Sequence, residues 1–258
     1  MSIRLLRLPT GRFKTVFDQL VFEEKLFRRT NENWCIFSTG KPRPEIVMGM
    51  SGKPEKLLNV EHVRERDVEV LKRFSGGGTV VVDDDVLFVS WVCNKDLLPR
   101  RISGSPPALM QWSAEFYQEV VDQLPRMDGS VGEFGLQEHD YCLGKHKFAG
   151  NAQCLTRGRW VHHTSFLWDF KTENMDLLQL PEKRPEYRND RTHDDFLCRL
   201  KDHIEGDDHE VLELAIVNNI KRHFDAYSVD FDEVEAHLEA NQDIERSARR
   251  ISTKLVEI

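Results

Sequence analysis

The chain has 258 residues, of which 40% are hydrophobic and 31% are charged, and its formal net charge at pH 7 is −8. This composition is that of a folded globular protein, and the negative charge argues against a general nucleic-acid binder. No apolar run approaches the roughly 20 residues of a membrane helix, and the N-terminus lacks the apolar core of a secretory signal.

The cysteines indicate a reducing compartment. They are odd in number, widely spaced and without a C-x-x-C pair, which predicts free thiols; they are Cys35, Cys93, Cys142, Cys154 and Cys198. Basic residues without an acidic residue occupy the chain up to Lys14, which leaves a mitochondrion or plastid as the alternative to the cytoplasm. We therefore expect an intracellular, soluble protein without a membrane or nucleic-acid partner.

The first third of the chain alternates predicted helices and strands. Apolar residues recur at helical spacing over about residues 13–29, and a short helix follows Asn59. Runs rich in β-branched and aromatic residues predict four strands, at residues 34–38, 45–49, 68–74 and 86–93.

A triple glycine divides the stretch from Lys72 to Val82, which predicts a strand, a turn and a second strand. Glycines without Cβ atoms let the backbone lie against a ligand with its N–H groups free to donate. Lys72 and Arg73 add positive charge, and an arginine can donate two parallel hydrogen bonds to a phosphate. The turn therefore suits a phosphate or an acyl phosphate, with a flexible hairpin tip as the alternative. It matches neither G-x-G-x-x-G nor the P-loop pattern.

Three adjacent acidic residues, Asp83, Asp84 and Asp85, form the next predicted turn. Carboxylates are ligands that Mg²⁺ prefers, which makes these residues candidates for a metal site. A solvated hairpin turn is the alternative explanation.

The remainder of the chain predicts a mixture of helices and strands. A helix is expected from about Ala108 to Leu124, and a strand, a tight turn and a second strand from Glu138 to Gln153. In the next strand, residues 160–168, the adjacent His162 and His163 must point to opposite faces. An irregular basic loop at 180–188 precedes further helices, expected at residues 192–203, 210–224 and 244–255, and a short strand near residues 227–231.

Two of these stretches together resemble the catalytic domain of lipoate-protein ligase A, in the biotin/lipoate ligase superfamily. They are the glycine turn from Lys72 to Val80 and the strand from Lys147 to Gln153, with Asp140 before the lysine and His163 on a later strand. The resemblance covers roughly residues 13–230. It implies a mixed α/β fold with a largely antiparallel central sheet flanked by helices. It also implies one catalytic domain over residues 1–258, with a helical C-terminal extension from about residue 232 and no full accessory domain.

What the resemblance implies for function is a two-step reaction. Lipoate or octanoate is activated with ATP and Mg²⁺ to an acyl-AMP, and the acyl group passes to a lysine of a lipoyl carrier domain. The implied acceptors are lipoyl domains of 2-oxoacid dehydrogenase E2 type or glycine cleavage H-protein type. Because no full accessory domain is expected, a separate accessory protein is a further expected partner.

The resemblance also implies roles for individual residues. Lys147 would bridge the acyl carbonyl and the phosphate, and Asp140 would orient the incoming lysine or accept its proton. The residues implied to bind ATP or the acyl adenylate are Arg73, Ser75, Gly76, Gly77, Gly78, Thr79, Val80, Val81, Gly150, Asn151, Ala152 and His163.

Alternatives within and outside this activity stay open. An octanoyl or lipoyl transferase of the same fold would hold the acyl group on a cysteine as a thioester, but Cys142 and Cys154 lie at non-matching positions. A biotin ligase is disfavoured because its G-R-G-R-x-G loop is missing. A non-catalytic module that binds an acyl group or a partner is the third alternative, and the presence of Asp140 and Lys147 argues against it. The segment Val82–Val86 departs from the family's His-Asp-x-Gly-Asn, which puts a phosphate or metal contact there in question.

Overall fold

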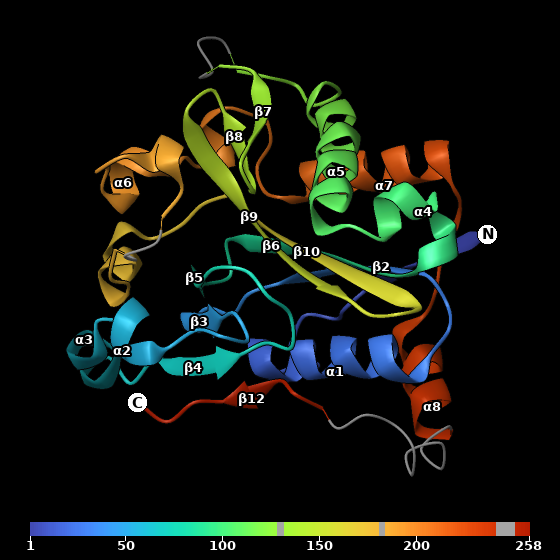
Figure 1. Ribbon diagram of the computed structural model, residues 1–258, viewed down its shortest axis with the longest axis horizontal. Helices are drawn as coiled ribbons and strands as arrows, with labels where there is room; N and C mark the ends of the chain where they lie inside the picture. Colours follow the sequence, from blue (N-terminus) through green and yellow to red (C-terminus); the bar gives the residue numbers. More distant parts are fainter. Residues whose placement is uncertain (128–131, 181–183, 241–250) are drawn as a thin grey trace.

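The computed structural model describes residues 1–127, 132–180, 184–240 and 251–258, which form two β-sheets flanked by helices (Figure 1). The larger sheet has the strand order β11-β1-β2-β6-β10-β9-β8-β7. Its strands are β1 (Ser2–Arg7), β2 (Trp34–Thr39), β6 (Val86–Asn94), β7 (Phe134–Gln137), β8 (Asp140–Leu143), β9 (His146–Leu155), β10 (Arg159–Leu167) and β11 (Asp225–Ser228). β1 pairs in parallel with β2 and β11, and the other neighbours are antiparallel. The predicted mixed, largely antiparallel sheet is confirmed.

The smaller sheet has the order β12-β4-β3-β5. Its strands are β3 (Glu45–Met48), β4 (Glu69–Lys72), β5 (Val80–Val82) and β12 (Lys254–Leu255). Because β4 and β5 lie on either side of β3, the glycine-rich residues 73–79 must cross the end of β3. Two backbone hydrogen bonds fix this crossing: the Arg73 N–H donates to Met48 O at 3.0 Å, and the Met50 N–H donates to Ser75 O at 3.1 Å.

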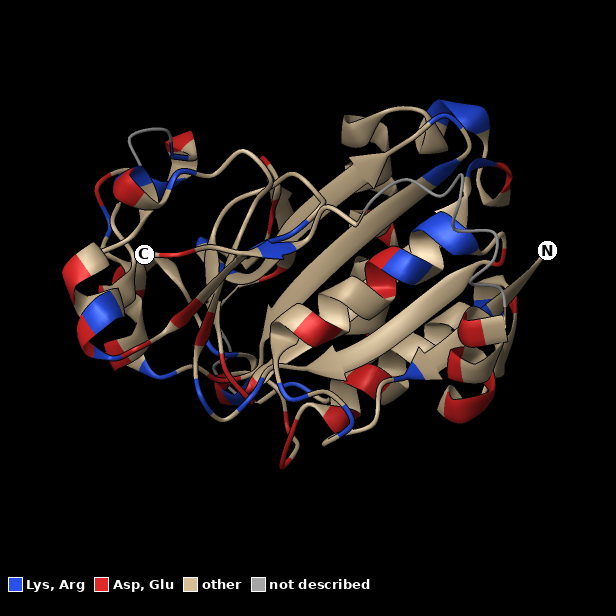
Figure 2. Cartoon of the chain, turned by 90° about the horizontal axis from the view of Figure 1, so that it is seen from below, with Lys and Arg blue, Asp and Glu red and all other residues tan. Residues whose placement is uncertain are grey.

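Helices cover both faces of the larger sheet (Figure 1). The longer helices are α1 (Val16–Arg29), α5 (Pro106–Val121), α7 (Glu210–His223) and α8 (Phe231–Ala240). The short helices are α2 (Pro54–Leu57), α3 (Val60–Glu65), α4 (Arg100–Ser103) and α6 (His193–Phe196), with 3-10 turns η1 (Lys95–Leu97), η2 (Thr172–Leu177), η3 (Glu186–Arg188) and η4 (Leu200–Asp202). α5 and α7 share one hydrophobic core with the sheet, and α1 and α8 share another on the opposite face. Charged residues lie mainly on helices and loops, and the strands are mostly uncharged (Figure 2).

Most predicted elements are present with shifted ends. The first helix begins at Val16 because the Thr15 side chain caps it, accepting a hydrogen bond from the Asp18 N–H at 3.1 Å. The predicted strand over residues 68–74 ends at Lys72, so that Arg73 already belongs to the turn.

Two predicted helices near the C-terminus differ from the structure. The helix predicted at residues 192–203 is wrong beyond Phe196, because Leu197 bridges to Lys147 and the Cys198 N–H donates to Lys147 O at 2.9 Å. These contacts pull the chain into an extended form. The helix predicted at residues 244–255 lies partly outside the described residues, and its described end is extended, with Leu255 paired to Leu71.

Within the described residues, no helix has both the length and the apolar character needed to cross a membrane.

Candidate active site

A cavity of about 1330 Å³ lies over one face of the larger sheet. Its floor comes from β6, β9 and β10, where Ser165 lies opposite Gly150 and Phe88, and His163 lies opposite Ala152 in the strand register. All five of these residues line the cavity. Small side chains at Gly150 and Ala152 therefore leave room directly above the sheet.

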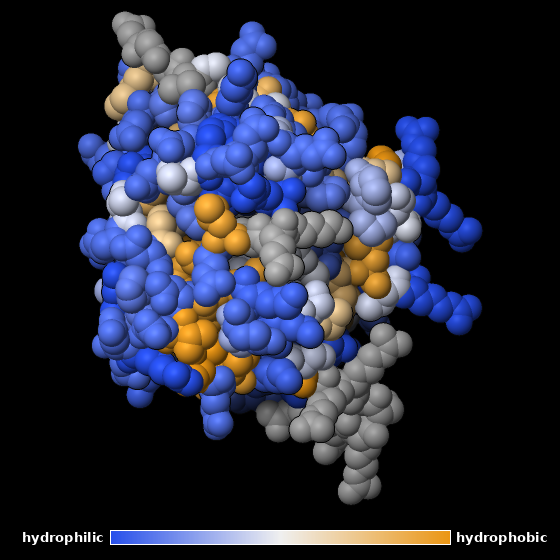
Figure 3. Space-filling view, turned by 60° about the vertical axis from the view of Figure 1, so that its left-hand side comes forward, coloured by the Kyte–Doolittle hydropathy of each residue, from blue (hydrophilic) through white to orange (hydrophobic). Residues whose placement is uncertain are grey.

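The walls of the cavity come from segments that are far apart in the chain. They include residues 51–53 and 56–57 around α2, the glycine turn at 76–80, and parts of the segment 178–196. On the side of the molecule that carries α2, α3 and α6, apolar side chains lie among hydrophilic ones (Figure 3). The lining has the same mixed character, since Leu20, Val47 and Phe88 contribute apolar surface beside charged residues.

A β-bulge in β9 brings Lys147 to the cavity. Cys142 of β8 pairs with Lys147, but the preceding Tyr141 pairs with Ala149, so Phe148 is an extra residue. Because of the bulge, Phe148 and Ala149 are both buried in the core while Lys147 and Gly150 both line the cavity. A Cβ atom built on Gly150 would lie 3.7 Å from Lys147 Nζ, which shows that the lysine amine extends over the glycine.

Lys147 is paired with a buried carboxylate. Its Nζ lies 2.8 Å from Asp140 Oδ1, and Asp140 is only 7% exposed. The other carboxylate oxygen, Oδ2, accepts a hydrogen bond from the Tyr187 hydroxyl at 2.8 Å. The structure therefore brings together the two residues predicted to be catalytic, and the Tyr187 hydroxyl contacts one of them from outside the cavity lining.

The glycine turn lies beside Ala152. Ala152 is two residues after Gly150 on β9, so these two positions are about 7 Å apart along the strand. Gly77 has φ +116°, and a Cβ atom there would lie 2.8 Å from Asn151 O and 2.7 Å from an Arg73 guanidinium nitrogen. The Gly76 N–H already donates to Gln153 O at 3.0 Å. Within the described part of the chain, the N–H groups of residues 77–79 have no such acceptor, so they are the ones available to a ligand.

Arg73 supports the turn from beneath. Its guanidinium donates to Val47 O at 3.2 Å, to Gly76 O at 3.2 Å and to Gly78 O at 2.7 Å. Burial lowers its pKa to about 10, and no described carboxylate forms an ion pair with it. Arg73 thus fixes the turn and adds a buried positive charge to the cavity, instead of presenting a free guanidinium fork as its residue type alone suggested.

His163 lies on the cavity face of β10, as predicted, and His162 lies on the opposite face. His163 Nδ1 is 3.3 Å from the Ser75 hydroxyl, and its Nε2 is 3.0 Å from a carboxylate oxygen of Glu23, within ion-pair distance but without hydrogen-bond alignment. His162 is fully buried, and burial lowers its pKa to about 3. The His163 ring is therefore oriented by two side chains behind it.

Two of the predicted binding residues, Ser75 and Val81, do not line the cavity. Ser75 is fully buried below the turn, and Val81 packs into the core of the smaller sheet. The Asn151 amide donates to His139 O at 3.0 Å and accepts from the Thr164 hydroxyl at 2.9 Å. The other predicted binding residues, Arg73, Gly76, Gly77, Gly78, Thr79, Val80, Gly150, Asn151, Ala152 and His163, all line the cavity.

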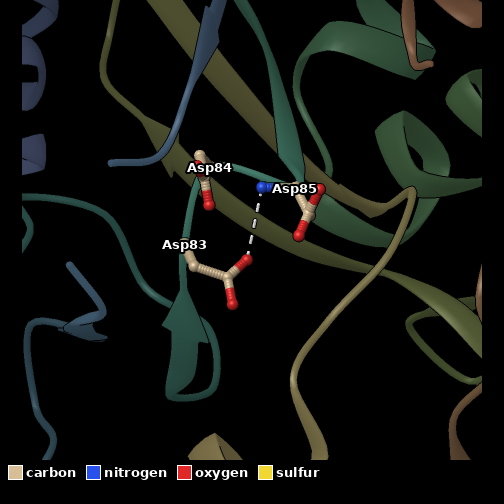
Figure 4. A group of neighbouring side chains, drawn as sticks. All are labelled: Asp83, Asp84 and Asp85. Carbon is tan, nitrogen blue, oxygen red and sulfur yellow. Dashed lines mark hydrogen bonds between the residues drawn. The ribbon is translucent and has the colours of Figure 1, made fainter. Parts of the chain in front are cut away.

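The acidic turn between β5 and β6 holds three carboxylates whose oxygens lie within 4.8 Å of one another (Figure 4). The buried Asp83 carboxylate already accepts hydrogen bonds from Asn174 Nδ2 at 3.0 Å and from the Asp85 N–H at 3.3 Å. Burial raises the pKa of both Asp83 and Asp85. None of Asp83, Asp84 and Asp85 lines the cavity, and we assign no metal to this turn.

Two functional candidates were missed by the sequence because they come from an irregular segment. Tyr187 and Arg188 belong to η3, and neither follows a periodic pattern or a motif. Arg188 is 5% exposed and lines the cavity. Its guanidinium carbon, Cζ, lies 4.6 Å from the centroid of the Phe196 ring. Its Nη2 is buried without a hydrogen-bond partner in the part of the chain that the structure describes. Its Nε donates to Arg191 O at 3.3 Å, so the free Nη2 donor of this buried cation is suited to an anionic ligand.

None of the five cysteines, all of which are described, lines the cavity. Burial raises the pKa of Cys142 to about 11 and that of Cys198 to about 12, and it also raises the pKa of Cys154. Raised pKa values leave little thiolate at neutral pH, and the thiolate is the reactive form. The structure therefore offers no cysteine as a nucleophile in this cavity.

The protein family described as the lipoyl protein ligase A/B catalytic domain matches residues 15–239. Among individual proteins, the inactive lipoate-protein ligase 2 of Plasmodium falciparum is 29% identical over 250 residues, covering 75% of this chain and 63% of that protein. The octanoyltransferase LipM of Moorella thermoacetica is 26% identical over 161 residues, covering 56% of this chain and 58% of the relative. The chain thus spans less than two thirds of the length of either relative.

Solved structures share the fold at low sequence identity. A crystal structure of lipoate-protein ligase A bound with ATP superposes with a TM-score of 0.70 at 16% identity, covering 98% of both chains. A bipartite lipoate-protein ligase from Thermoplasma acidophilum, described together with its E2 lipoyl domain, gives a TM-score of 0.67 at 16% identity, covering 94% of this chain and 92% of that one.

Proposed function

The chain belongs to the lipoyl protein ligase A/B catalytic domain family, and we propose that it activates lipoate or octanoate with ATP and transfers the acyl group to a lysine of a lipoyl domain. The observation that carries this proposal is the pair formed by Lys147 and Asp140, 2.8 Å apart in a large cavity that also holds the buried guanidinium groups of Arg73 and Arg188.

In the first step a carboxylate oxygen of the acid attacks the α-phosphorus of ATP. A new O–P bond forms, the bond to the β-phosphate oxygen breaks, and pyrophosphate leaves with the electron pair. Negative charge grows on the phosphoryl oxygens during this step, and preorganised cations and N–H donors stabilise it. We assign this role to the Lys147 ammonium, to the N–H groups of residues 77–79 and to the guanidinium of Arg188.

The second step is attack of an acceptor lysine on the acyl carbon. A C–N bond forms, the bond from the acyl carbon to the phosphate oxygen breaks, and AMP leaves. The attacking amine must be neutral and must lose a proton as the amide forms. Asp140, the buried carboxylate beside Lys147, would orient the attacking amine or accept that proton. The Lys147 ammonium would stabilise charge on the acyl oxygen and on the leaving phosphate.

The cavity suits both substrates in size and chemistry. Its volume of about 1330 Å³ is above the roughly 300–1,000 Å³ typical of small-molecule pockets, which leaves room for an acyl chain and a nucleotide together. Apolar side chains of Leu20, Val47 and Phe88 offer a wall for the acyl chain. A magnesium ion accompanying ATP would neutralise triphosphate charge. The described carboxylates that line the cavity, and that could contact such an ion, are Asp140 and Glu138.

Acceptors and accessory factors are also part of the proposal. The T. acidophilum ligase described with its E2 lipoyl domain supports lipoyl domains as acceptors, of E2 type or glycine cleavage H-protein type. The bipartite nature of that ligase supports a separate accessory protein as a further partner.

A transferase that uses a cysteine thioester is the second candidate, favoured by the similarity to an octanoyltransferase. The position of the cysteines outside the cavity argues against it. A non-catalytic module is the third candidate, since a relative is named an inactive ligase. The intact pairing of Lys147 with Asp140 argues against that alternative.

One assay separates the three candidates. Purified protein is incubated with a lipoyl domain and either lipoate plus MgATP or an acylated carrier protein, and acylation of the domain is measured by mass spectrometry. The ligase proposal predicts ATP-dependent acylation that Lys147→Ala abolishes and Lys145→Ala retains, because Lys145 is exposed and does not line the cavity. Acylation only from the carrier protein, lost in Cys142→Ser or Cys154→Ser, would establish the transferase. No acylation by either route, even with an added accessory protein, would contradict the ligase proposal and favour a binding module.

A further inference from the structure

The carboxylate of Asp140 is shared between donors from two distant parts of the chain. Oδ1 lies 2.8 Å from Lys147 Nζ, and Oδ2 accepts the Tyr187 hydroxyl at 2.8 Å. The final torsion of an aspartate side chain has a broad energy profile, so a carboxylate with one partner can turn. With a donor on each oxygen, its orientation toward Lys147 is fixed.

We propose that Tyr187 is a positioning residue that holds the Asp140 carboxylate toward Lys147, and that it makes the geometry of this pair depend on the docking of segment 184–198. The catalytic consequence rests on the proposed ligase function, whereas the positioning itself does not.

The Tyr187 hydroxyl is a donor in this arrangement. Burial and the neighbouring Asp140 carboxylate both raise the pKa of Tyr187, so the phenol keeps its proton. A hydrogen bond from a neutral hydroxyl to a carboxylate is charge-assisted and stronger than a bond between neutral groups. The Cys142 thiol lies 3.4 Å from the same hydroxyl oxygen and donates to it, which leaves the hydroxyl proton for Asp140.

The segment that carries Tyr187 is itself held against β8 and β9. The Arg191 guanidinium donates to Tyr187 O at 2.7 Å and to Lys145 O at 2.8 Å. The Tyr187 ring packs on Phe196, with ring centroids 5.3 Å apart. The Cys198 N–H, at the end of the segment, donates to Lys147 O. The same segment therefore contacts the backbone of Lys147 and, through Tyr187, the carboxylate of Asp140. Displacing the segment would therefore release Asp140 and Lys147 together.

The first test compares Tyr187→Phe with a matched control. Removing the hydroxyl deletes the bond to Asp140 but keeps the ring on Phe196, whereas Cys142→Ala deletes the other partner of the hydroxyl and keeps that bond. We expect Tyr187→Phe to lower kcat of ATP-dependent acylation by about tenfold or more, the size expected for a hydrogen bond to a charged group, with KM for ATP and lipoate within about twofold of wild type. Cys142→Ala should keep wild-type kcat. An unchanged kcat in Tyr187→Phe, or an equal loss in both variants, would overturn the proposal.

A double-mutant cycle shows whether Tyr187 acts through Asp140. If it does, Asp140→Asn and the double variant Asp140→Asn/Tyr187→Phe should have the same kcat, because the hydroxyl no longer has a carboxylate to orient. Multiplicative losses would instead indicate an independent structural role.

A chemical measurement tests the positioning without relying on ligase activity. Acetylation of Lys147 by an N-hydroxysuccinimide ester is followed by mass spectrometry, with Lys145 as the internal reference. The 2.8 Å ion pair with Asp140 restrains the Lys147 amine and hinders its approach to the ester, so Tyr187→Phe should acetylate Lys147 several times faster than wild type, and Cys142→Ala at the wild-type rate. Equal rates in Tyr187→Phe and wild type would refute the positioning role even in a protein without ligase activity.

Discussion

Replacing Gly77 by alanine tests whether the glycine turn is held in the conformation that exposes its N–H groups. Gly77 has φ +116°, where a residue with a Cβ atom is strained by about 1–3 kcal/mol. The new Cβ would also lie 2.8 Å from Asn151 O and 3.1 Å from the Ala152 Cβ. Overpacking of this kind costs about 1–3 kcal/mol more, because a backbone carbonyl must move. We therefore expect Gly77→Ala to lower the free energy of unfolding by about 2–6 kcal/mol.

The neighbouring Gly78 provides the control. A Cβ atom on Gly78 would meet nothing within 4 Å, and its φ is outside the range that disfavours a side chain. Gly78→Ala should leave the free energy of unfolding within about 1 kcal/mol of wild type, since a compatible glycine-to-alanine change acts mainly on the unfolded chain. Its methyl group would nevertheless stand in the open cavity beside the free N–H groups and should weaken nucleotide binding.

Urea unfolding followed by tryptophan fluorescence measures both stabilities, and calorimetric titration with ATP measures binding. The lower bound of about 2 kcal/mol for Gly77→Ala corresponds to a fall in Tm of roughly 4–8 °C for a domain of this size. Wild-type stability in Gly77→Ala would refute the argument that positive φ and close backbone contacts constrain this turn. Wild-type ATP affinity in Gly78→Ala would remove the turn from the binding site.

Three further predictions address the cavity and the core. Arg188→Met should raise KM for ATP about tenfold, because it removes a buried guanidinium that lines the cavity. Lys145→Ala, at an exposed position outside the cavity, should keep the wild-type KM, and an unchanged KM in Arg188→Met would contradict an anion-binding role. Cys142→Ser and Cys154→Ser should each retain at least about half of the ATP-dependent acylation activity, because neither thiol lines the cavity, and loss of activity in either would favour a thioester route. Burial raises the pKa of Glu45 to about 7 from an ordinary 4.5, so the folded protein binds more protons than the unfolded chain between these pH values. Stability should fall by about 3 kcal/mol as pH rises through this window, at 1.36 kcal/mol per pKa unit, and urea unfolding of Glu45→Gln should lack that part of the slope.

The local features of the fold could be predicted from the sequence because they depend on neighbouring residues. The apolar spacing after Val16 gives α1, and the β-branched run before the acidic turn gives β5. The meeting of Asp140 with Lys147 was expected only from the family resemblance, since they are seven positions apart and lie on two different strands. The bulge at Phe148 that turns Lys147 into the cavity leaves no mark in the pattern of residue types.

Other parts of the site depend on contacts between distant residues. Tyr187 reaches Asp140 across 47 positions, from a segment without periodicity. The Gly76 N–H donates to Gln153 O, whereas the N–H groups of residues 77–79 stay free among the described residues. Residue types alone do not show which N–H groups of the turn are used by the protein. The helix predicted through residues 192–203 fails for the same reason, because pairing of Leu197 with Lys147 outweighs local helical preference.

The central claim is that Lys147 and Asp140 hold a site that forms an acyl adenylate. The most direct measurement incubates the protein with lipoate and MgATP in the absence of any acceptor and follows pyrophosphate release together with lipoyl-AMP by chromatography. The wild-type protein is expected to form both products in equal amounts within the first turnover. The Lys145→Ala variant should form the same amounts as wild type, and the Lys147→Ala variant should form neither product. Lipoyl-AMP formation that is unaffected in Lys147→Ala would contradict the claim.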